Sequence, residues 1–255
     1  MQSVYQVAEI YHYGFGFRDT KLESAVLLAA SDRFGNAGRR FLEIACGDCP
    51  YAIDLIQAGV DYHGLDRAHD MLAFSKARLE AAGLSAEGIL HTADMKDFTL
   101  PHRFDLAFVL MGSLVYLSNK EFLQHLDRVY MHLNPGGLYI QEWCIEYAPS
   151  TQSQSRWTES SPLGEVGVYY SRQQRSALNQ RFDEQFNLTL NGELVASTTE
   201  IVYVRYPNEF ALLLQCRSAQ WEMVGCYNHW DLDTPLDDRE EINRPLCILK
   251  KAHRG

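Results

Sequence analysis

The stretch Phe41–Ala52, FLEIACGDCPYA, passes from an apolar strand through a single glycine into a helix. Phe41 to Ala45 predicts a short buried strand, and the apolar residues of Tyr51–Ala58 recur on one face of a helix. A turn between a strand and a helix often holds a nucleotide, because the N–H groups at the start of a helix bind anions. Here the acids Glu43 and Asp48 flank the turn, so the charge of the ligand is the question that decides the function.

Strand and helix signals alternate on both sides of this turn. Strands separated by helices of this length imply a parallel, doubly wound sheet with right-handed crossovers. The further predicted strands are Val60–Leu65, Ile89–Ala93, Phe104–Met111, Leu138–Cys144, Trp221–Tyr227 and Pro245–Lys251. The further predicted helices are Thr20 to about Phe34, Ala68–Ala82, one that follows the capping box Ser118-Asn119-Lys120-Glu121, and one that begins at Pro207.

The sequence changes character after Cys144. Residues Ala148–Ser161 are rich in Ser, Thr, Gln and Pro and are predicted to form an exposed loop. From Gly167 to Tyr206 the pattern is that of antiparallel strands, and Asn191-Gly192 is a strong hairpin signal. We therefore expect an N-terminal lid segment and helix at 1–34, a core at 35–146 and 207–255, and an inserted loop and antiparallel β-ribbon at 147–206.

The composition disfavours several classes of partner. The net charge is −10 and no basic patch offsets it, so nucleic acid is not an expected partner. No apolar stretch of about 18 residues is available to span a bilayer, and the first residues lack a signal-peptide pattern, so we expect a cytoplasmic protein without a membrane partner. The six cysteines are scattered in the manner of reduced core thiols, and no metal site is expected.

The turn itself argues against a phosphate ligand. A dinucleotide site needs Gly-x-Gly-x-x-Gly, so that pyrophosphate can approach the backbone, and an acid about 20 residues later for the ribose. Asp66 supplies the acid, but Ala45–Pro50 contains one glycine and carries Asp48 where a phosphate would lie. S-adenosylmethionine fits better, because it has a ribose and two positive charges and no phosphate.

In this turn and in several later motifs, the sequence resembles the class I S-adenosylmethionine-dependent methyltransferases. Their first motif is an acid followed by small residues and a glycine-rich turn, which Glu43-Ile44-Ala45-Cys46-Gly47 matches, while Cys49 replaces the third glycine. Asp66, Asp94-Met95 and Leu133–Gly137 match later motifs in order. The resemblance implies a Rossmann-like, doubly wound, mostly parallel sheet of seven strands whose last strand is antiparallel. It is strongest to small-molecule N-methyltransferases that act on amino acids or amino sugars.

The resemblance also assigns residues to the cofactor. Asp66 would bind the ribose hydroxyls and Asp94-Met95 the adenine. The aromatic N-terminal segment would close over the cofactor, with Arg18 near its carboxylate. The expected cofactor-binding residues are Tyr11, Arg18, Glu43, Ala45, Gly47, Asp66, Arg67, Met71, Asp94, Met95 and Leu110.

In-line methyl transfer requires mainly that the reactants are aligned and water is excluded. Such folds bind ligands at the carboxyl edge of the sheet, where the catalytic candidates are Tyr116 after the fourth strand and Glu142 and Trp143 at the fifth. We expect a small-molecule acceptor between this edge and the ribbon. Nitrogen is preferred to oxygen as its nucleophile, because a hydroxyl needs a base and Gly112-Ser113-Leu114 offers none.

Several alternatives remain open at this stage. An O-methyltransferase, a nicotinamide oxidoreductase and a non-catalytic binding protein are all compatible with the fold. Asp48 could serve only as a helix N-cap, and Cys46 and Cys49 are more simply packing residues than a redox or zinc pair. The sequence leaves the acceptor and the oligomeric state undetermined.

Overall fold

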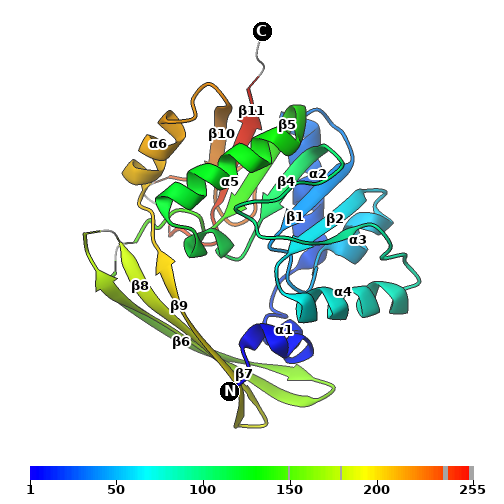
Figure 1. Cartoon of the computed structure of the whole chain (residues 1–255), viewed down its shortest axis with the longest axis vertical. Helices are drawn as coiled ribbons and strands as arrows, with labels where there is room; N and C mark the ends of the chain where they lie inside the picture. Colours follow the sequence, from blue (N-terminus) through cyan, green and yellow to red (C-terminus); the bar gives the residue numbers. More distant parts are fainter. Residues whose placement is uncertain (149, 179, 238–240, 253–255) are drawn as a thin grey trace.

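The computed structural model describes residues 1–148, 150–178, 180–237 and 241–252. Within these residues a seven-stranded sheet has the order β10-β11-β5-β4-β1-β2-β3 (Figure 1). The strands are β1 (Arg40–Ile44), β2 (Asp61–Asp66), β3 (Leu90–Thr92), β4 (Phe104–Val109), β5 (Leu133–Glu142), β10 (Trp221–Tyr227) and β11 (Leu246–Lys251). β11 is antiparallel to both β5 and β10, whereas β1 to β5 pair in parallel. The predicted doubly wound sheet with an antiparallel last strand is confirmed.

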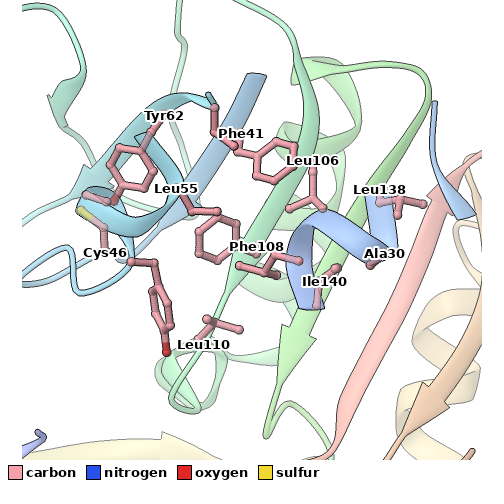
Figure 2. Close-up of a cluster of buried hydrophobic side chains, with 14 of the residues drawn as sticks. Ala30, Phe41, Cys46, Leu55, Tyr62, Leu106, Phe108, Leu110, Leu138 and Ile140 are labelled. Carbon is pink, nitrogen blue, oxygen red and sulfur yellow. The ribbon is translucent and has the colours of Figure 1, made fainter. Parts of the chain in front are cut away.

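Helices cover both faces of this sheet. One face packs against α2 (Thr20–Phe34), α3 (Ala52–Gln57) and α4 (His69–Ala81), and the other against α5 (Asn119–His132) and α6 (Pro207–Gln215). Successive residues of β4 alternate between the two cores, so that Leu106 and Phe108 contact the first layer and Ala107 and Val109 the second. Figure 2 shows the first core, where Phe108 and Leu106 lie among residues of several elements. Burial on both faces explains why β4 is almost entirely apolar.

The segment inserted after β5 forms a second, separate sheet. Its antiparallel strands are β6 (Gln152–Ser161), β7 (Gly164–Ser176), β8 (Arg181–Leu190) and β9 (Glu193–Tyr203). Figure 1 shows this sheet across one end of the large sheet. The predicted loop at Ala148–Ser161 is wrong from Gln152 onward, because these residues pair with β7 over the full length of β6. β6 is an edge strand with mostly exposed side chains, so its composition resembles that of a loop.

Local signals at the ends of elements account for much of this architecture. Ser118 and Glu121 form the expected capping box at the start of α5. Asn191 and Gly192, with φ of 51° and 83°, close the hairpin between β8 and β9 as predicted. β5 begins at Leu133, earlier than expected, because Leu133 already pairs with Phe104 before the irregularity that follows. Over the described ranges, no helix is long and apolar enough to cross a membrane.

The N-terminal segment packs on the inserted sheet. It contains a short 3-10 helix, η1 (Val4–Gln6), and α1 (Ala8–Gly14). Val4 and Phe15 are buried together with Val168 of β7 and Leu188 of β8. The indole Nε1 of Trp157 in β6 donates to the Gly14 carbonyl at 2.7 Å. Figure 1 shows α1 between the second sheet and α4, so this segment joins the two parts of the protein.

Candidate active site

Several backbone N–H groups of the turn after β1 are bound within the protein. Ala45, Gly47 and Cys49 have positive φ angles of 54°, 52° and 49°, which bend the chain from β1 toward α3. The Gly47 N–H donates to Asp66 Oδ2 at 2.8 Å, and the Cys49 N–H donates to the Cys46 carbonyl at 2.8 Å. A β-carbon at Gly47 would lie 3.3 Å from the methyl carbon of Met71, so glycine keeps this surface open. These N–H groups are therefore not aimed at a phosphate.

Asp66 lies at the end of β2, directly beside this turn. One of its carboxylate oxygens accepts from Gly47, and the other accepts from the Ala68 N–H at 2.8 Å. Burial raises the pKa of Asp66 above its usual value, although both hydrogen bonds act in the opposite direction. Each carboxylate oxygen has a second lone pair. The side chain is thus fixed in place and can still accept hydrogen bonds from a ligand hydroxyl.

Asp48 and Glu43 are two buried acids at this turn whose pKa values are shifted in opposite directions. Asp48 Oδ2 lies 2.6 Å from His12 Nδ1, and Asp48 Oδ1 lies 3.6 Å from an Arg18 guanidinium nitrogen. Burial alone would raise the pKa of Asp48, but Arg18 and His12 hold it below its usual value. Burial raises the pKa of Glu43 well above its usual value, against the 2.6 Å hydrogen bond from the Tyr62 hydroxyl. Asp48 therefore keeps its negative charge more readily than Glu43 does.

The structure does not support Asp48 as a helix cap. The N-cap of α3 is Tyr51, and no side chain caps this helix. Instead, the Asp48 carbonyl accepts a hydrogen bond from Arg78 of α4 at 2.7 Å. Asp48 thus links the turn to α1, to Arg18 and to α4.

A cavity of about 640 Å³ opens between the carboxyl ends of β1 to β5 and the inserted sheet. This volume lies within the range of small-molecule sites. Every residue that the sequence led us to expect at the cofactor lines the cavity: Tyr11, Arg18, Glu43, Ala45, Gly47, Asp66, Arg67, Met71, Asp94, Met95 and Leu110. Segments far apart in the chain thus meet at one place.

Comparison with known proteins agrees with this arrangement of the cavity residues. Residues 41–137 match the family described as "Methyltransferase domain". After this match we call residues 41–137 the methyltransferase domain. The match confirms the resemblance to class I methyltransferases for residues 41–137. The solved structures described below confirm it for the fold.

Two curated relatives of this chain come from Streptomyces. The dTDP-3-amino-3,6-dideoxy-alpha-D-glucopyranose N,N-dimethyltransferase of Streptomyces fradiae is 30% identical over 141 residues, which is 54% of this chain and 52% of that protein. A dTDP-3-amino-3,4,6-trideoxy-alpha-D-glucopyranose N,N-dimethyltransferase of Streptomyces venezuelae is 31% identical over 40% of each chain. The chain matches about half the length, or less, of these curated relatives.

Solved structures resemble the whole chain. The CcbJ methyltransferase of Streptomyces caelestis gives a TM-score of 0.76 at 18% identity, covering 98% of this chain and 99% of the other. DesVI of Streptomyces venezuelae gives a TM-score of 0.74 at 18% identity and 96% coverage of both. At this identity the likeness establishes the fold, including the region outside the methyltransferase domain.

Tyr116, at the end of the methyltransferase domain's short helix η2 (Ser113–Tyr116), lies where the cavity meets the inserted sheet. Its hydroxyl donates to Glu184 Oε1 of β8 at 2.9 Å and lies 3.2 Å from the Tyr5 hydroxyl. The Tyr170 hydroxyl of β7 donates to Glu184 Oε2 at 3.1 Å. Burial raises the pKa of Tyr116 well above its usual value, so this phenol stays neutral.

The structure does not support Glu142 as a catalytic candidate. Glu142 is buried and is not among the residues that line the cavity. Its carboxylate accepts from the Met111 N–H at 2.9 Å, from Trp230 Nε1 at 2.9 Å and from Arg244 Nε at 2.7 Å. These bonds tie β5 to the residues that follow β4 and to the segment that precedes β11. The next residue, Trp143, has left the strand with a positive φ of 51°, and it lines the cavity together with Cys144, Ile145 and Glu146.

Sequence reasoning missed the residues that the inserted sheet contributes. Tyr170 and Arg172 of β7 and Glu184 of β8 all line the cavity. One signal was available in β7, because Val166, Val168, Tyr170 and Arg172 occupy alternate positions and so share a face. The apolar half of that face packs on the N-terminal segment, and its polar half reaches the cavity.

Proposed function

We propose that this protein transfers a methyl group from S-adenosylmethionine to an amine nitrogen of a small molecule. The observation that carries the proposal is the turn after β1. Its Gly47 N–H is bound by Asp66, and the buried carboxylate of Asp48 lies beside it. A pyrophosphate would meet an acid at this turn instead of free N–H groups, whereas a cationic ligand with a ribose would meet complementary charge.

The residues of the cavity fit this cofactor. We assign the ribose hydroxyls to Asp66, because its carboxylate is fixed by two N–H groups and retains lone pairs. We assign the cofactor's carboxylate to Arg18, whose nearest acid, Asp48, is not in hydrogen-bonding contact at 3.6 Å. Asp94 and Met95, which follow β3, are assigned to the adenine. When bound, the cofactor supplies an electrophilic methyl group on a sulfonium.

The chain's own contribution is alignment and exclusion of water. η1 and α1 cover the cavity from the side of the inserted sheet, and Tyr5 and Tyr11 form part of its wall. We propose the division into a lid segment at 1–34, a core at 35–146 and 207–255, and a cover at 147–206. The aromatic wall keeps water from the reacting atoms, which approach to about 3 to 3.5 Å before transfer.

For the acceptor we propose an amino sugar or a molecule of similar size. The two Streptomyces relatives are named as N,N-dimethyltransferases of dTDP-linked amino sugars. The end of the cavity beside the inserted sheet carries the polar side chains of Tyr116, Tyr170 and Glu184, which suit a hydroxylated and basic molecule. An acceptor bound there would have its nucleophile facing the cofactor region.

The proposal is tested by binding followed by turnover. Calorimetry with S-adenosylhomocysteine should give micromolar affinity, and NADH should give no heat. Labelled S-adenosylmethionine is then incubated with amines, including dTDP-3-amino-3,6-dideoxyglucose and free hexosamines, and with the matching alcohols. Label transferred to amines supports the proposal. NADH binding without any response to S-adenosylhomocysteine, or transfer to alcohols alone, would refute it.

A further inference from the structure

Glu184 is a buried carboxylate in the wall of the cavity. The residue is 7% exposed, and it lies near the middle of β8 in the inserted sheet. Two phenols hold it in place, because the Tyr116 hydroxyl donates to one carboxylate oxygen and the Tyr170 hydroxyl to the other. Each oxygen keeps a lone pair for a further donor. The carboxylate is thus oriented from both sides and still has capacity to bind.

The protein does not neutralise this acid with a salt bridge. Arg172 lies directly opposite Glu184 in the register of β7 and β8, yet its guanidinium pairs with Glu146 at 2.5 Å. On the other side, Glu200 of β9 is opposite Glu184, and its own partner is Arg67 at 3.4 Å. Among the residues that the structure describes, none forms a salt bridge with Glu184. A buried carboxylate without a counter-charge is costly unless a cation binds to it.

We infer that Glu184 binds the ammonium group of the acceptor and acts as the general base that removes its proton. This inference rests on the proposed function and adds a named residue, from the inserted sheet, to the reaction. The location supports it, because Tyr116 connects Glu184 to Tyr5 and hence to the wall shared with the cofactor region. Glu184 therefore lies in the part of the cavity wall that we assign to the acceptor.

The step balances in atoms and charge. The acceptor enters as R–NH₃⁺ and gives one proton to the Glu184 carboxylate, which leaves a neutral amine with a free lone pair. That lone pair forms the new N–C bond while the S–CH₃ bond breaks, and S-adenosylhomocysteine leaves with the electron pair. The methylated amine carries the positive charge, and Glu184 returns its proton to solvent after product release. An ammonium has no lone pair, so methylation without this proton transfer cannot proceed.

The electrostatic surroundings shift the pKa of Glu184 upward, which is the direction that a general base requires. Burial raises the pKa of Glu184 above its usual value, and the hydrogen bonds from Tyr116 and Tyr170 oppose the shift. Arg172 also lowers this pKa, whereas Glu200 raises it. A general base is most effective when its pKa lies close to the working pH. The groups that face or adjoin Glu184 are Tyr116 from η2, Tyr170 and Arg172 from β7, Glu200 from β9 and, through Tyr116, Tyr5 from η1.

The test compares Glu184→Gln with Asp183→Asn. Asp183 is the preceding residue of β8, and its half-exposed side chain pairs with Arg175 and does not line the cavity. With a hexosamine or dTDP-amino sugar that the unmodified protein methylates, kcat/KM for Glu184→Gln should fall at least 100-fold at pH 7. The deficit should shrink as the pH approaches the pKa of the amine, because free amine then binds directly. Asp183→Asn should keep both the rate and the pH profile.

A purely structural role would give a different pattern. Glutamine can accept from one of the two tyrosines with its oxygen and donate to the hydroxyl of the other with its amide N–H, so a lost anchor would lower the rate equally at every pH or not at all. S-adenosylhomocysteine affinity and thermal unfolding are measured for each variant, and Glu184→Asp and Tyr170→Phe serve as milder changes if Glu184→Gln is unstable. Partial activity of Glu184→Asp with the same pH trend supports the assignment.

The outcomes separate this inference from the proposed function. Amine turnover by Glu184→Gln with an unchanged pH profile would overturn the base and leave the methyltransferase proposal intact. The thermal shift that the same amines produce at pH 7, with S-adenosylhomocysteine bound, is measured in parallel and should vanish in Glu184→Gln. If the unmodified protein binds S-adenosylhomocysteine but neither methylates nor is shifted by any amine, the inference fails and only the cofactor part of the proposal stands.

Discussion

His12 Nδ1 lies 2.6 Å from Asp48 Oδ2, and this contact joins the N-terminal helix α1 to the turn after β1. At the last residue of the same helix, the Gly14 carbonyl accepts from Trp157 of the inserted sheet. α1 is therefore attached both to the turn that we assign to the cofactor and to the sheet that we assign to the acceptor. This arrangement predicts that cofactor binding and closure of the acceptor site are coupled.

Asp48→Asn should destabilise the protein markedly. Arg18 has a side chain that is 6% exposed, and Asp48 is the acid within salt-bridge distance of it among the described residues. Loss of that charge leaves a buried cation uncompensated, so the free energy of unfolding should fall by about 3 kcal/mol in urea denaturation. Asp32→Asn removes an exposed pair with Arg39 and should cost less than about 1 kcal/mol. Equal losses of unfolding free energy in the two variants would show that the buried pair stabilises the protein no more than the exposed pair does.

Asp66→Asn should weaken the cofactor and leave the fold largely intact. An asparagine cannot accept from both Gly47 and Ala68 with its two terminal atoms, and it loses the charge that we assign to the ribose hydroxyls. The affinity for S-adenosylhomocysteine should fall by about 1 to 3 kcal/mol, measured by calorimetry. Asp61→Asn is the matched control, because Asp61 lies at the other end of β2 and forms a half-exposed pair with Arg40. Unchanged affinity in Asp66→Asn would refute the ribose assignment.

The sequence predicted the site best where a functional residue lies at or directly beside the end of a predicted strand. Glu43, Gly47 and Asp66 are close in the chain to the strands that place them, and parallel strands bring their carboxyl ends to a common edge. Their presence in one cavity could therefore be predicted without knowledge of the packing. Glu142 lies outside the cavity despite its place at the same edge, because Met111 and the distant residues Trp230 and Arg244 bind its carboxylate, whereas its neighbour Trp143 lines the cavity.

The inserted sheet could not be predicted with the same precision. β6 is a solvated edge strand, and Trp157 is the one large apolar residue within it, so hydrophobic alternation is almost absent. Glu184 is a single acid in a strand, and its importance depends on Tyr116 from a distant helix and Tyr170 from the neighbouring strand. Contacts between residues far apart in the chain cannot be predicted from the local sequence. Only the folded register of β7 with β8 reveals that Arg172 faces Glu184 while pairing elsewhere.

Stability should decrease as the pH falls from about 6.5 to about 4. Burial lowers the pKa of His125 and of His63 to about 4. The unfolded chain has histidine pKa values near 6.5, so across this window it binds protons that the folded state does not. The contribution of both neutral side chains is fully present above about pH 6.5 and is lost progressively toward pH 4.

The pH effect is measured as the free energy of unfolding in urea at intervals from pH 7.5 to 4.5. His125 is the stronger case, because its Nδ1–H donates to the Met95 carbonyl at 2.7 Å and its Nε2 must then accept from the Tyr139 hydroxyl. His125→Gln should be less stable at pH 7.5 and should show a shallower decline. A profile that is flat between pH 6.5 and 4.5 in the unmodified protein would contradict the buried neutral histidines.

Trp157→Phe should loosen the N-terminal segment while keeping most of the apolar contact. The Trp157 ring packs edge-on against Phe15 and Phe17, and its N–H is the donor to Gly14. Phenylalanine retains an aromatic ring but leaves that carbonyl without its donor, a loss of about 1 kcal/mol. Amide exchange of residues 4–15, followed by mass spectrometry, should therefore quicken roughly fivefold, since 1.4 kcal/mol corresponds to a factor of ten.

Because α1 also contacts Asp48 through His12, the loosened segment should reduce S-adenosylhomocysteine affinity, and bound S-adenosylhomocysteine should in turn restore slow exchange. The control is Arg156→Gln, the neighbouring residue on the exposed side of β6, which should alter neither quantity. Faster exchange in Trp157→Phe without any change in affinity would mean that α1 is attached to the inserted sheet independently of the cofactor. In that case the coupling inferred from the His12–Asp48 contact would be wrong.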